Sequence, residues 1–165
     1  MLVDQQQVND YDWSPDGKWI VYARSDGFFA SELYILPLDG SEPARNVTRY
    51  ATFNGDVSWN NTNNKICFLS QRRGTFAMNV MTLQKPTASP ASSPMGSPPV
   101  VQPTPAIDWE DIHLRVERPG GNVASEGTIA RNGRWIAYRA GVGEDDLWLV
   151  SVDGFVMQRL SFGRT

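Results

Sequence analysis

The strongest constraint on the fold is a hairpin pattern that occurs three times along the chain. The first copy, residues 11–24, reads YDWSPDGKWIVYAR: a strand ending in Trp13, a tight turn and a second strand. Pro15 fixes the φ value that the first central turn position needs, and Gly17 can adopt the left-handed conformation that follows. The apolar run after Lys18 is rich in aromatic and β-branched residues, which favours a buried strand.

Two further strands complete this first unit. A third strand is expected over residues 32–38 (ELYILPL), Asp39 and Gly40 turn the chain back, and a short fourth strand is expected over residues 44–48. The unit is therefore antiparallel, four-stranded and roughly forty residues long. That is the spacing expected of a β-propeller blade.

The same unit recurs twice. Trp59 follows Trp13 by 46 residues and again ends a strand, over residues 56–59, with further strands expected over 65–70 and 76–83. In the third unit RWIAYRA repeats the second strand, so that Trp135 matches Trp19 and Tyr138 matches Tyr22. Ile129 lies 70 residues after Trp59, and removing an insertion of roughly 23 residues leaves about 47, the same period.

That insertion, residues 84–106, holds seven of the eleven prolines of the chain. Such a stretch cannot form a strand ladder, so an extended loop is expected. Composition alone also allows a linker between two domains. The repeat instead places it inside the second unit, before a fourth strand expected around residues 112–117.

The three units predict one all-β domain over residues 1–165, an open or partial β-propeller of three four-stranded antiparallel blades. Their expected bounds are about 8–49, about 53–118 with the insertion 84–106, and about 122–163. Continuous apolar runs such as LYILPL favour sheets buried on both faces over a single antiparallel sandwich.

The repeat WSPDGKWIVYAR, with a third strand ending in Asp-Gly, resembles those of TolB-type propellers and tricorn-type serine peptidases. The segment IDWEDIHLRV resembles one that tricorn-like peptidases carry near the end of a propeller, with the matching positions Ile107, Asp108, Ile112, Arg115 and Val116. Complete propellers of these families have six or seven blades. The resemblance implies a non-catalytic segment that scaffolds or gates peptide access, because the family's catalytic Ser and His lie in a C-terminal peptidase region that nothing here matches.

Composition excludes several classes of function. A net charge of −3 and a pI near 5.1 argue against nucleic acid and anionic membrane surfaces as partners. The one cysteine excludes an intrachain disulfide and a cysteine-built zinc site. No apolar run approaches the ~20 residues of a membrane span. The first twenty residues lack a signal-peptide pattern, and the cytoplasm and the periplasm both stay open as compartments.

Few residues suggest chemistry. His113, the only histidine, lies beside Glu110 and Asp111, but one histidine without a second cluster makes a poor metal site. In the expected strand it would alternate with Ile112 and Leu114, as a surface or edge histidine. No G-x-S-x-G occurs. We therefore expect no catalytic, cofactor-binding or metal-binding residue, no cofactor, and no enzyme activity of this chain alone.

Other conspicuous residues have structural explanations. Cys67 aligns with Val21 and Ala137 inside strands, which predicts an inert buried thiol. Acidic residues 144–146 are expected to form a solvated turn. Asn46 and Asn60 begin triplets of the glycosylation type, which matter only in a secretory pathway. Five tryptophans at repeat-equivalent positions are expected to pack between blades: Trp13, Trp19, Trp59, Trp135 and Trp148.

Two functional hypotheses remain open at this point. One is a propeller wall within a larger tricorn-like peptidase. The other is a stand-alone interaction subunit that assembles with itself or with a protein partner. Both predict protein or peptide partners, through self-association or further blades. An arc of three blades leaves one apolar face uncovered at each end, so the isolated chain is not expected to be a well-behaved monomer.

Overall fold

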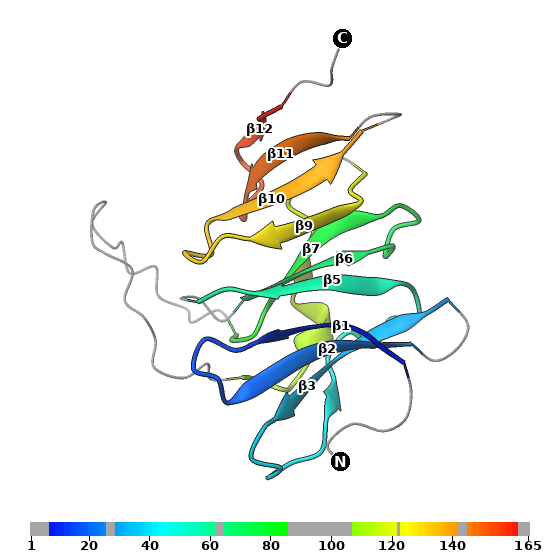
Figure 1. Ribbon diagram of the computed structural model, residues 1–165, viewed down its shortest axis with the longest axis vertical. Coiled ribbons are helices and arrows are strands. Elements are labelled where there is room, and N and C mark those ends of the chain that lie inside the picture. The colour runs from blue at the N-terminus through cyan, green and yellow to red at the C-terminus, as the bar shows by residue number, and fades with distance from the viewer. Residues whose placement is uncertain are drawn as a thin grey trace.

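The protein consists of three four-stranded antiparallel sheets that lie one above another along its long axis (Figure 1). This computed structural model describes residues 7–25, 29–61, 65–85, 107–121, 123–141 and 145–161. In each sheet the strands follow one another in chain order. The predicted all-β class and the three four-stranded sheets are confirmed. Residues 86–106, nearly all of the expected insertion, lie outside the described residues.

We name the three sheets blades 1, 2 and 3. Blade 1 contains β1 (Val8–Trp13), β2 (Trp19–Ser25), β3 (Ser31–Pro37) and β4 (Arg45–Asn46). Blade 2 contains β5 (Asn54–Trp59), β6 (Lys65–Ser70), β7 (Ala77–Thr82) and β8 (Val116–Glu117). Blade 3 contains β9 (Glu126–Ile129), β10 (Trp135–Ala140), β11 (Asp146–Ser151) and β12 (Met157–Arg159).

The strand register next to the first turn is the same in the three blades. The paired residues at the first turn are Trp13 with Ile20, Trp59 with Ile66, and Ile129 with Ile136. One strand further on, Trp19 pairs with Pro37 and Trp135 with Ser151. A slip of one residue would turn every side chain to the other face of its sheet. The predicted equivalence of Trp19 with Trp135 is therefore confirmed.

The turn between the first two strands has the predicted chemistry. Gly17 has φ 68° and its N–H donates to the Ser14 carbonyl at 2.9 Å, while Gly133 has φ 66°. The Ser14 hydroxyl also accepts the N–H of Trp19 at 2.9 Å. In blade 2 the side-chain oxygen of Asn60 takes this role for Lys65, at 2.8 Å. Asn60 thus replaces a serine cap where the local sequence looks least like the repeat.

Two apolar cores fill the spaces between blades. The first joins residues on the face of blade 1 that meets blade 2, such as Val21 and Ile35, to Phe68 and Met81 of blade 2. The second joins blade 2 to blade 3 and contains the buried Tyr138. Blade 2 therefore has one face packed on blade 1 and the other packed on blade 3.

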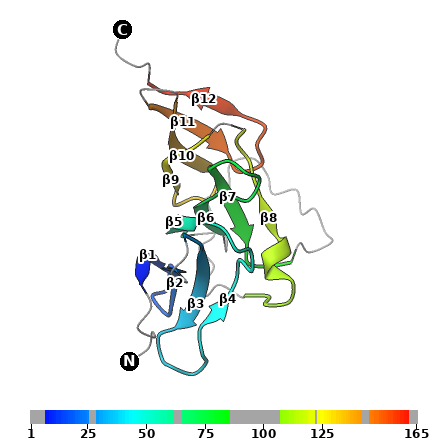
Figure 2. The ribbon, with the colours of Figure 1, turned by 90° about the vertical axis from the view of Figure 1, so that its right-hand side faces the viewer.

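The strand predicted around residues 112–117 is largely wrong. A short 3₁₀ helix, η1 (Ile112–Leu114), precedes β8, as Figure 2 shows. Asp111 has a left-handed φ of 53°, which ends any extended run at that point. The Arg115 guanidinium donates to four backbone carbonyls, those of Thr82, Leu83, Asp108 and Glu110. His113 consequently lies in a helical turn and does not alternate with its neighbours along a strand.

The described part of the chain contains no helix with the length and apolar character that a membrane crossing requires.

Candidate functional site

Side chains of β1 bind the backbone of β5 in the next blade. The Asp10 carboxylate accepts the N–H of Val57. Two residues further along, Asp12 Oδ2 accepts the N–H of Trp59 at 2.7 Å. The other oxygen of the Asp12 carboxylate accepts the N–H of Trp13 in its own strand, at 2.8 Å. One carboxylate thus connects the first strands of two blades.

The same arrangement joins blade 2 to blade 3. Asp56 accepts the N–H of Gly127, and the Ser58 hydroxyl accepts the N–H of Ile129 at 3.0 Å. We call these four contacts the interblade ladder. Its acceptors lie at matching positions of β1 and β5, and its donors at matching positions of β5 and β9. The next acceptor positions, on β9, are Glu126 and Thr128.

The last blade presents an uncovered face. Leu33 and Val47 of blade 1 are completely buried, because blade 2 covers them. Their equivalents in blade 3, Leu147 and Leu160, are 41% and 45% exposed. We call this the forward face, defined by Glu126, Thr128, Ala137, Arg139, Leu147 and Leu160. It keeps acceptor and apolar positions of an internal blade contact, but has Arg139 where blade 1 has Ala23, and no blade covers it in the described chain.

The first blade presents the complementary face. Trp59 is 5% exposed, whereas Trp13 at the same position of β1 is 51% exposed and Tyr11 is 60% exposed. Next to them the rings of Tyr22 and Tyr34 stack at 5.6 Å, with the Arg24 guanidinium 4.0 Å from the Tyr34 ring centre. We call this the backward face.

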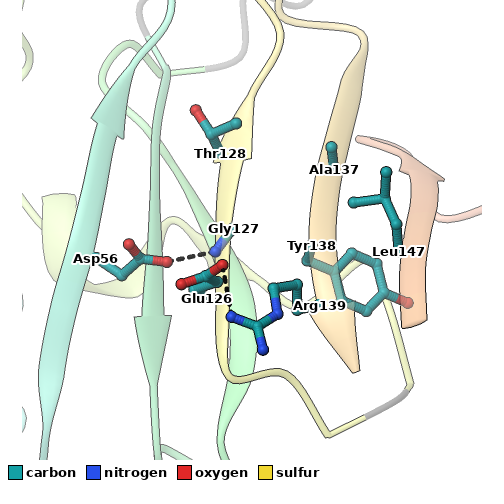
Figure 3. A pocket seen from close by; sticks show the side chains of 8 residues that line it. All are labelled: Asp56, Glu126, Gly127, Thr128, Ala137, Tyr138, Arg139 and Leu147. Carbon is teal, nitrogen blue, oxygen red and sulfur yellow. Dashed lines mark hydrogen bonds and ion pairs between the residues drawn. The ribbon is translucent and has the colours of Figure 1, made fainter. Parts of the chain in front are cut away.

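A cavity of about 290 Å³ opens where the forward face meets the ladder (Figure 3). Residues of blade 3 line most of it, and Asp56 of blade 2 reaches toward Gly127 from the side of β9 (Figure 3). Gly127 allows a close approach of β9 to its neighbours, because a Cβ there would lie 2.8 Å from the Ala137 carbonyl oxygen in its own sheet and 2.9 Å from Met78 Sδ of blade 2. The lining residues are Asp56, Glu126, Gly127, Thr128, Ala137, Tyr138, Arg139 and Leu147.

This end of the ladder is acidic. Burial raises the pKa of Asp56; the hydrogen bond from Gly127 opposes that rise, and the charges of Asp10 and Glu126 add to it. Arg139 is the balancing cation: its Nη1 lies 3.0 Å from Glu126 Oε1 and its Nη2 3.2 Å from Asp145 Oδ2. The hydrogen bond with Glu126 raises the pKa of Arg139.

The residues that first suggested chemistry are scattered and do not converge on this site. His113 is half-buried in η1; its carbonyl accepts from Arg72 at 3.4 Å, and its Nδ1 is buried without a partner in the described chain. Cys67 is completely buried, and that burial raises the pKa of its thiol, so the predicted buried thiol is confirmed. No cluster of three or more His, Cys, Asp or Glu suited to a metal occurs among the residues described.

Two of the other expectations need correction. The packing predicted for the tryptophans holds for Trp59 and fails for Trp13, which lies on the uncovered backward face. The solvated acidic turn is wrong at Asp146, which is 7% exposed and pairs with Arg159. Asn60 is completely buried in its capping role, which leaves no room there for an attached glycan.

Sequence reasoning missed the ladder acceptors. Asp10 and Asp12 look like ordinary polar residues of an alternating strand. The available signal was their recurrence, since Asp56 lies 46 residues after Asp10, one repeat period later. Only the fold shows that these side chains bind the following blade.

Comparison with solved structures shows the fold. A TolB-type protein from Agrobacterium tumefaciens is 17% identical with a TM-score of 0.65, over 98% of this chain and 49% of that chain. TolB from Acinetobacter baumannii is also 17% identical, with a TM-score of 0.66 over 98% of this chain and 34% of that chain. The tricorn protease is 13% identical, with a TM-score of 0.62 over 92% of this chain and 18% of that chain.

These similarities establish a propeller-type fold like that of TolB and tricorn propellers, with sheets that are not closed into a ring. The chain spans about half of the first of these structures and less of the others. No protein-family model matches the sequence, and no curated protein matches it.

Proposed function

We propose that this chain is a non-catalytic propeller segment that acts as a protein-binding scaffold, with the forward and backward faces as its binding surfaces. One observation carries the proposal. Positions that are 0–5% exposed between blades, Leu33 and Trp59, are 41% and 51% exposed at the ends, as Leu147 and Trp13. Covering such surface is favourable, and large exposed apolar patches are typical of interaction sites.

The occupants that fit these faces best are further blades. The interblade ladder supplies a template, because the two blade junctions of this chain use the same acceptor and donor positions. A blade beyond blade 3 would meet Glu126 and Thr128 as acceptors. A blade before blade 1 would cover Tyr11 and Trp13.

We further propose that the additional blades belong to a tricorn-like peptidase, in which this segment forms a wall that scaffolds or gates peptide access. Support comes from the segment that resembles tricorn peptidases. Ile112 is 1% exposed within the first core, Ile107 and Val116 pack against that core, and Arg115 fastens the segment to the end of β7. The segment therefore has a structural role, which suits a propeller wall.

The alternative is a stand-alone subunit that assembles with a second copy of itself. Two copies would then supply about the length of the TolB-type chain, of which this chain covers 49%. The two proposals differ in the size of the native polypeptide. An antibody against residues 145–161 should detect a much larger protein in the source cells if the peptidase proposal is right, and an 18.4 kDa band if the alternative is right.

Light scattering on the purified chain tests the binding faces. We expect dimers or larger assemblies of the 18.4 kDa chain, and a shift toward monomer in Leu147→Glu. Leu114→Glu is the matched control, because Leu114 is 70% exposed in η1 and belongs to neither face. A monodisperse wild-type monomer that binds no apolar dye would overturn the proposal, as would equal effects of the two substitutions.

The non-catalytic part of the proposal has its own test. Purified chain incubated with a mixture of peptides should leave them intact, as followed by mass spectrometry. The non-catalytic proposal would be contradicted if peptide cleavage copurified with the wild-type chain and was absent from both the Leu147→Glu and the His113→Ala variants.

A further inference from the structure

A second cavity, of about 180 Å³, lies at the opposite side of blade 2 from the ladder and shares no residue with the forward face. It is built by the loop after β6, the middle of β7 and the residues around β8, with Tyr50 from the connection between blades 1 and 2. Its lining residues are Tyr50, Arg72, Arg73, Asn79, Val116 and Arg118. Its volume is several times that of a water molecule, so it has room for a small ligand.

Three of the six lining residues are arginines, in a chain whose net charge is −3. Within the described ranges, none of the three forms an ion pair with a carboxylate. The charge of Glu32 acts on Arg72, but Glu32 Oε2 already accepts the Thr48 hydroxyl and the N–H of Tyr50. Glu32 keeps its charge in these hydrogen bonds, so one carboxylate faces three arginines and the cavity carries a net positive charge.

Two of the guanidiniums are held in place by neutral partners. Arg72 Nη2 donates to the Thr48 carbonyl at 2.7 Å, and the group lies 4.9 Å from the Tyr50 ring centre. Arg118 donates to the Gly120 carbonyl at 3.2 Å and to the Thr75 hydroxyl at 3.1 Å. Carbonyl and hydroxyl oxygens fix the orientation of a guanidinium and leave its charge intact. A guanidinium has five N–H donors, so each arginine keeps donors for a ligand.

One of these donors lacks an acceptor. Arg72 Nε is buried and has no hydrogen-bond partner in the described chain. Burial also lowers the pKa of Arg72, while Glu32 and Tyr50 oppose this effect. A partly buried guanidinium without a paired carboxylate is unfavourable, and an anion in the cavity would supply the opposite charge.

We propose that this cavity binds a phosphate group. A doubly charged tetrahedral oxyanion matches a cavity lined by three arginines better than a singly charged carboxylate does, because it offers more acceptor oxygens and more charge. Arginine is well suited to this task, since its planar fork of donors matches phosphate oxygens and stays charged. The cavity is thus a ligand site separate from the faces that bind further blades.

Isothermal titration with inorganic phosphate, at constant ionic strength, tests the proposal on the purified chain. Wild type should bind one phosphate per chain, and acetate should bind at least about tenfold more weakly. Arg73→Ala should weaken phosphate binding about tenfold, the effect expected from one lost charge-assisted hydrogen bond. Arg73 is the variant of choice because it is exposed and makes no fastening contact within the described residues. Arg73→Lys keeps the positive charge but loses the planar fork of donors. Its phosphate affinity should therefore lie between those of wild type and Arg73→Ala.

Arg134→Ala is the matched control. It removes the same charge from an exposed arginine of blade 3, away from the cavity, and should leave phosphate binding unchanged. Glycerol phosphate distinguishes the source of the group: tighter binding than inorganic phosphate assigns the cavity to a phosphate ester, and weaker binding to the free anion. Absence of saturable phosphate binding by folded wild type would overturn the proposal, and so would equal losses in Arg73→Ala and Arg134→Ala. The mass of the assembly is a separate readout, so failure of phosphate binding leaves the scaffold proposal standing.

Discussion

The Asp12 carboxylate accepts the backbone N–H of Trp59 at 2.7 Å, although the two residues are 47 positions apart in the chain. Trp59 is nearly buried, so its N–H has no water to replace this acceptor. A side chain of one blade thereby completes the hydrogen bonding of the next. This contact therefore adds to the apolar core in coupling the folding of the two blades.

Asp12→Ala should lower the free energy of unfolding by about 1–3 kcal/mol, because it leaves the buried N–H of Trp59 without an acceptor. Asp12→Asn keeps one acceptor oxygen and should lose less. Urea denaturation measures both. Glu42→Ala is the control: its pair with Arg45 is exposed, so the change should stay within about 0.5 kcal/mol. Equal effects of Asp12→Ala and Glu42→Ala would show that the contact has no energetic weight.

Gly127→Ala should lower the free energy of unfolding by about 1–3 kcal/mol. The added methyl would lie 2.8 Å from the backbone oxygen of Ala137, which cannot move without breaking the β9–β10 pairing. Thermal unfolding followed by circular dichroism measures the effect. Gly121→Ala is the matched substitution, because no atom lies within 4 Å of a Cβ at that position. An unchanged melting temperature for Gly127→Ala would mean that the sheets separate at little cost.

Replacement of residues 86–106 by Asp-Gly should be neutral or stabilising by about 1–2 kcal/mol, because a shorter loop costs less entropy to close. The flanking chain is already held together: the N–H of Asp108 donates to the Leu83 carbonyl at 2.9 Å, and the N–H of Lys85 to Asp108 Oδ2 at 2.7 Å. A Gly/Ser linker of the original length is the control and should match wild type. If either replacement abolished the folded state, the prediction that this segment is dispensable for folding would be wrong.

The stability of Asp56 variants should depend on pH with a definite sign. Burial raises the folded-state pKa of Asp56 above its ordinary value of 3.8. The folded state therefore binds the proton more tightly, and the unfolding free energy falls as pH rises from below 3.8 through the folded pKa. Asp56→Asn should remove this fall. The stability of Asp56→Asn relative to wild type should increase as pH rises from below 3.8 through the folded pKa of Asp56. Above that pKa the difference should stay constant.

Asp153→Asn serves as the control of opposite sign. Hydrogen bonds from the Ser151 hydroxyl and the N–H of Phe155 lower the pKa of Asp153. Its stabilisation is present above pH 3.8 and is lost as pH falls through the folded pKa. Urea titrations at several pH values should therefore give opposite slopes for the two substitutions. Equal slopes would contradict the assigned environments.

The fold was predictable from sequence where local chemistry repeats. The Pro15–Gly17 turn and the match of Trp19 with Trp135 depend on φ preferences and strand alternation, which are readable within a dozen residues. The segment around Ile112 was not predictable in this way. Its apolar spacing resembles a strand, but Arg115 binds carbonyls as distant as Thr82, and these contacts favour a helical turn.

The candidate sites were less accessible to sequence reasoning than the fold. The arginine cavity joins Tyr50, Arg72 and Arg118, which are far apart in the chain and meet only after blade 2 has formed. The uncovered faces were expected from the number of repeats. The ladder required knowledge of which side of each first strand faces the next blade, and local alternation does not determine that direction.

The interblade ladder also gives the arc a polarity. Each contact runs from side-chain acceptors of one blade to backbone donors of the following blade, so two forward faces cannot complete one another. If copies of this chain associate through these faces, they add head to tail, with the same rotation at each step. Such an interface closes into a ring when the rotations sum to a full turn and otherwise continues as a filament. A copy blocked at only one face would then act as a terminator, ending a growing assembly at that side while still binding through the other.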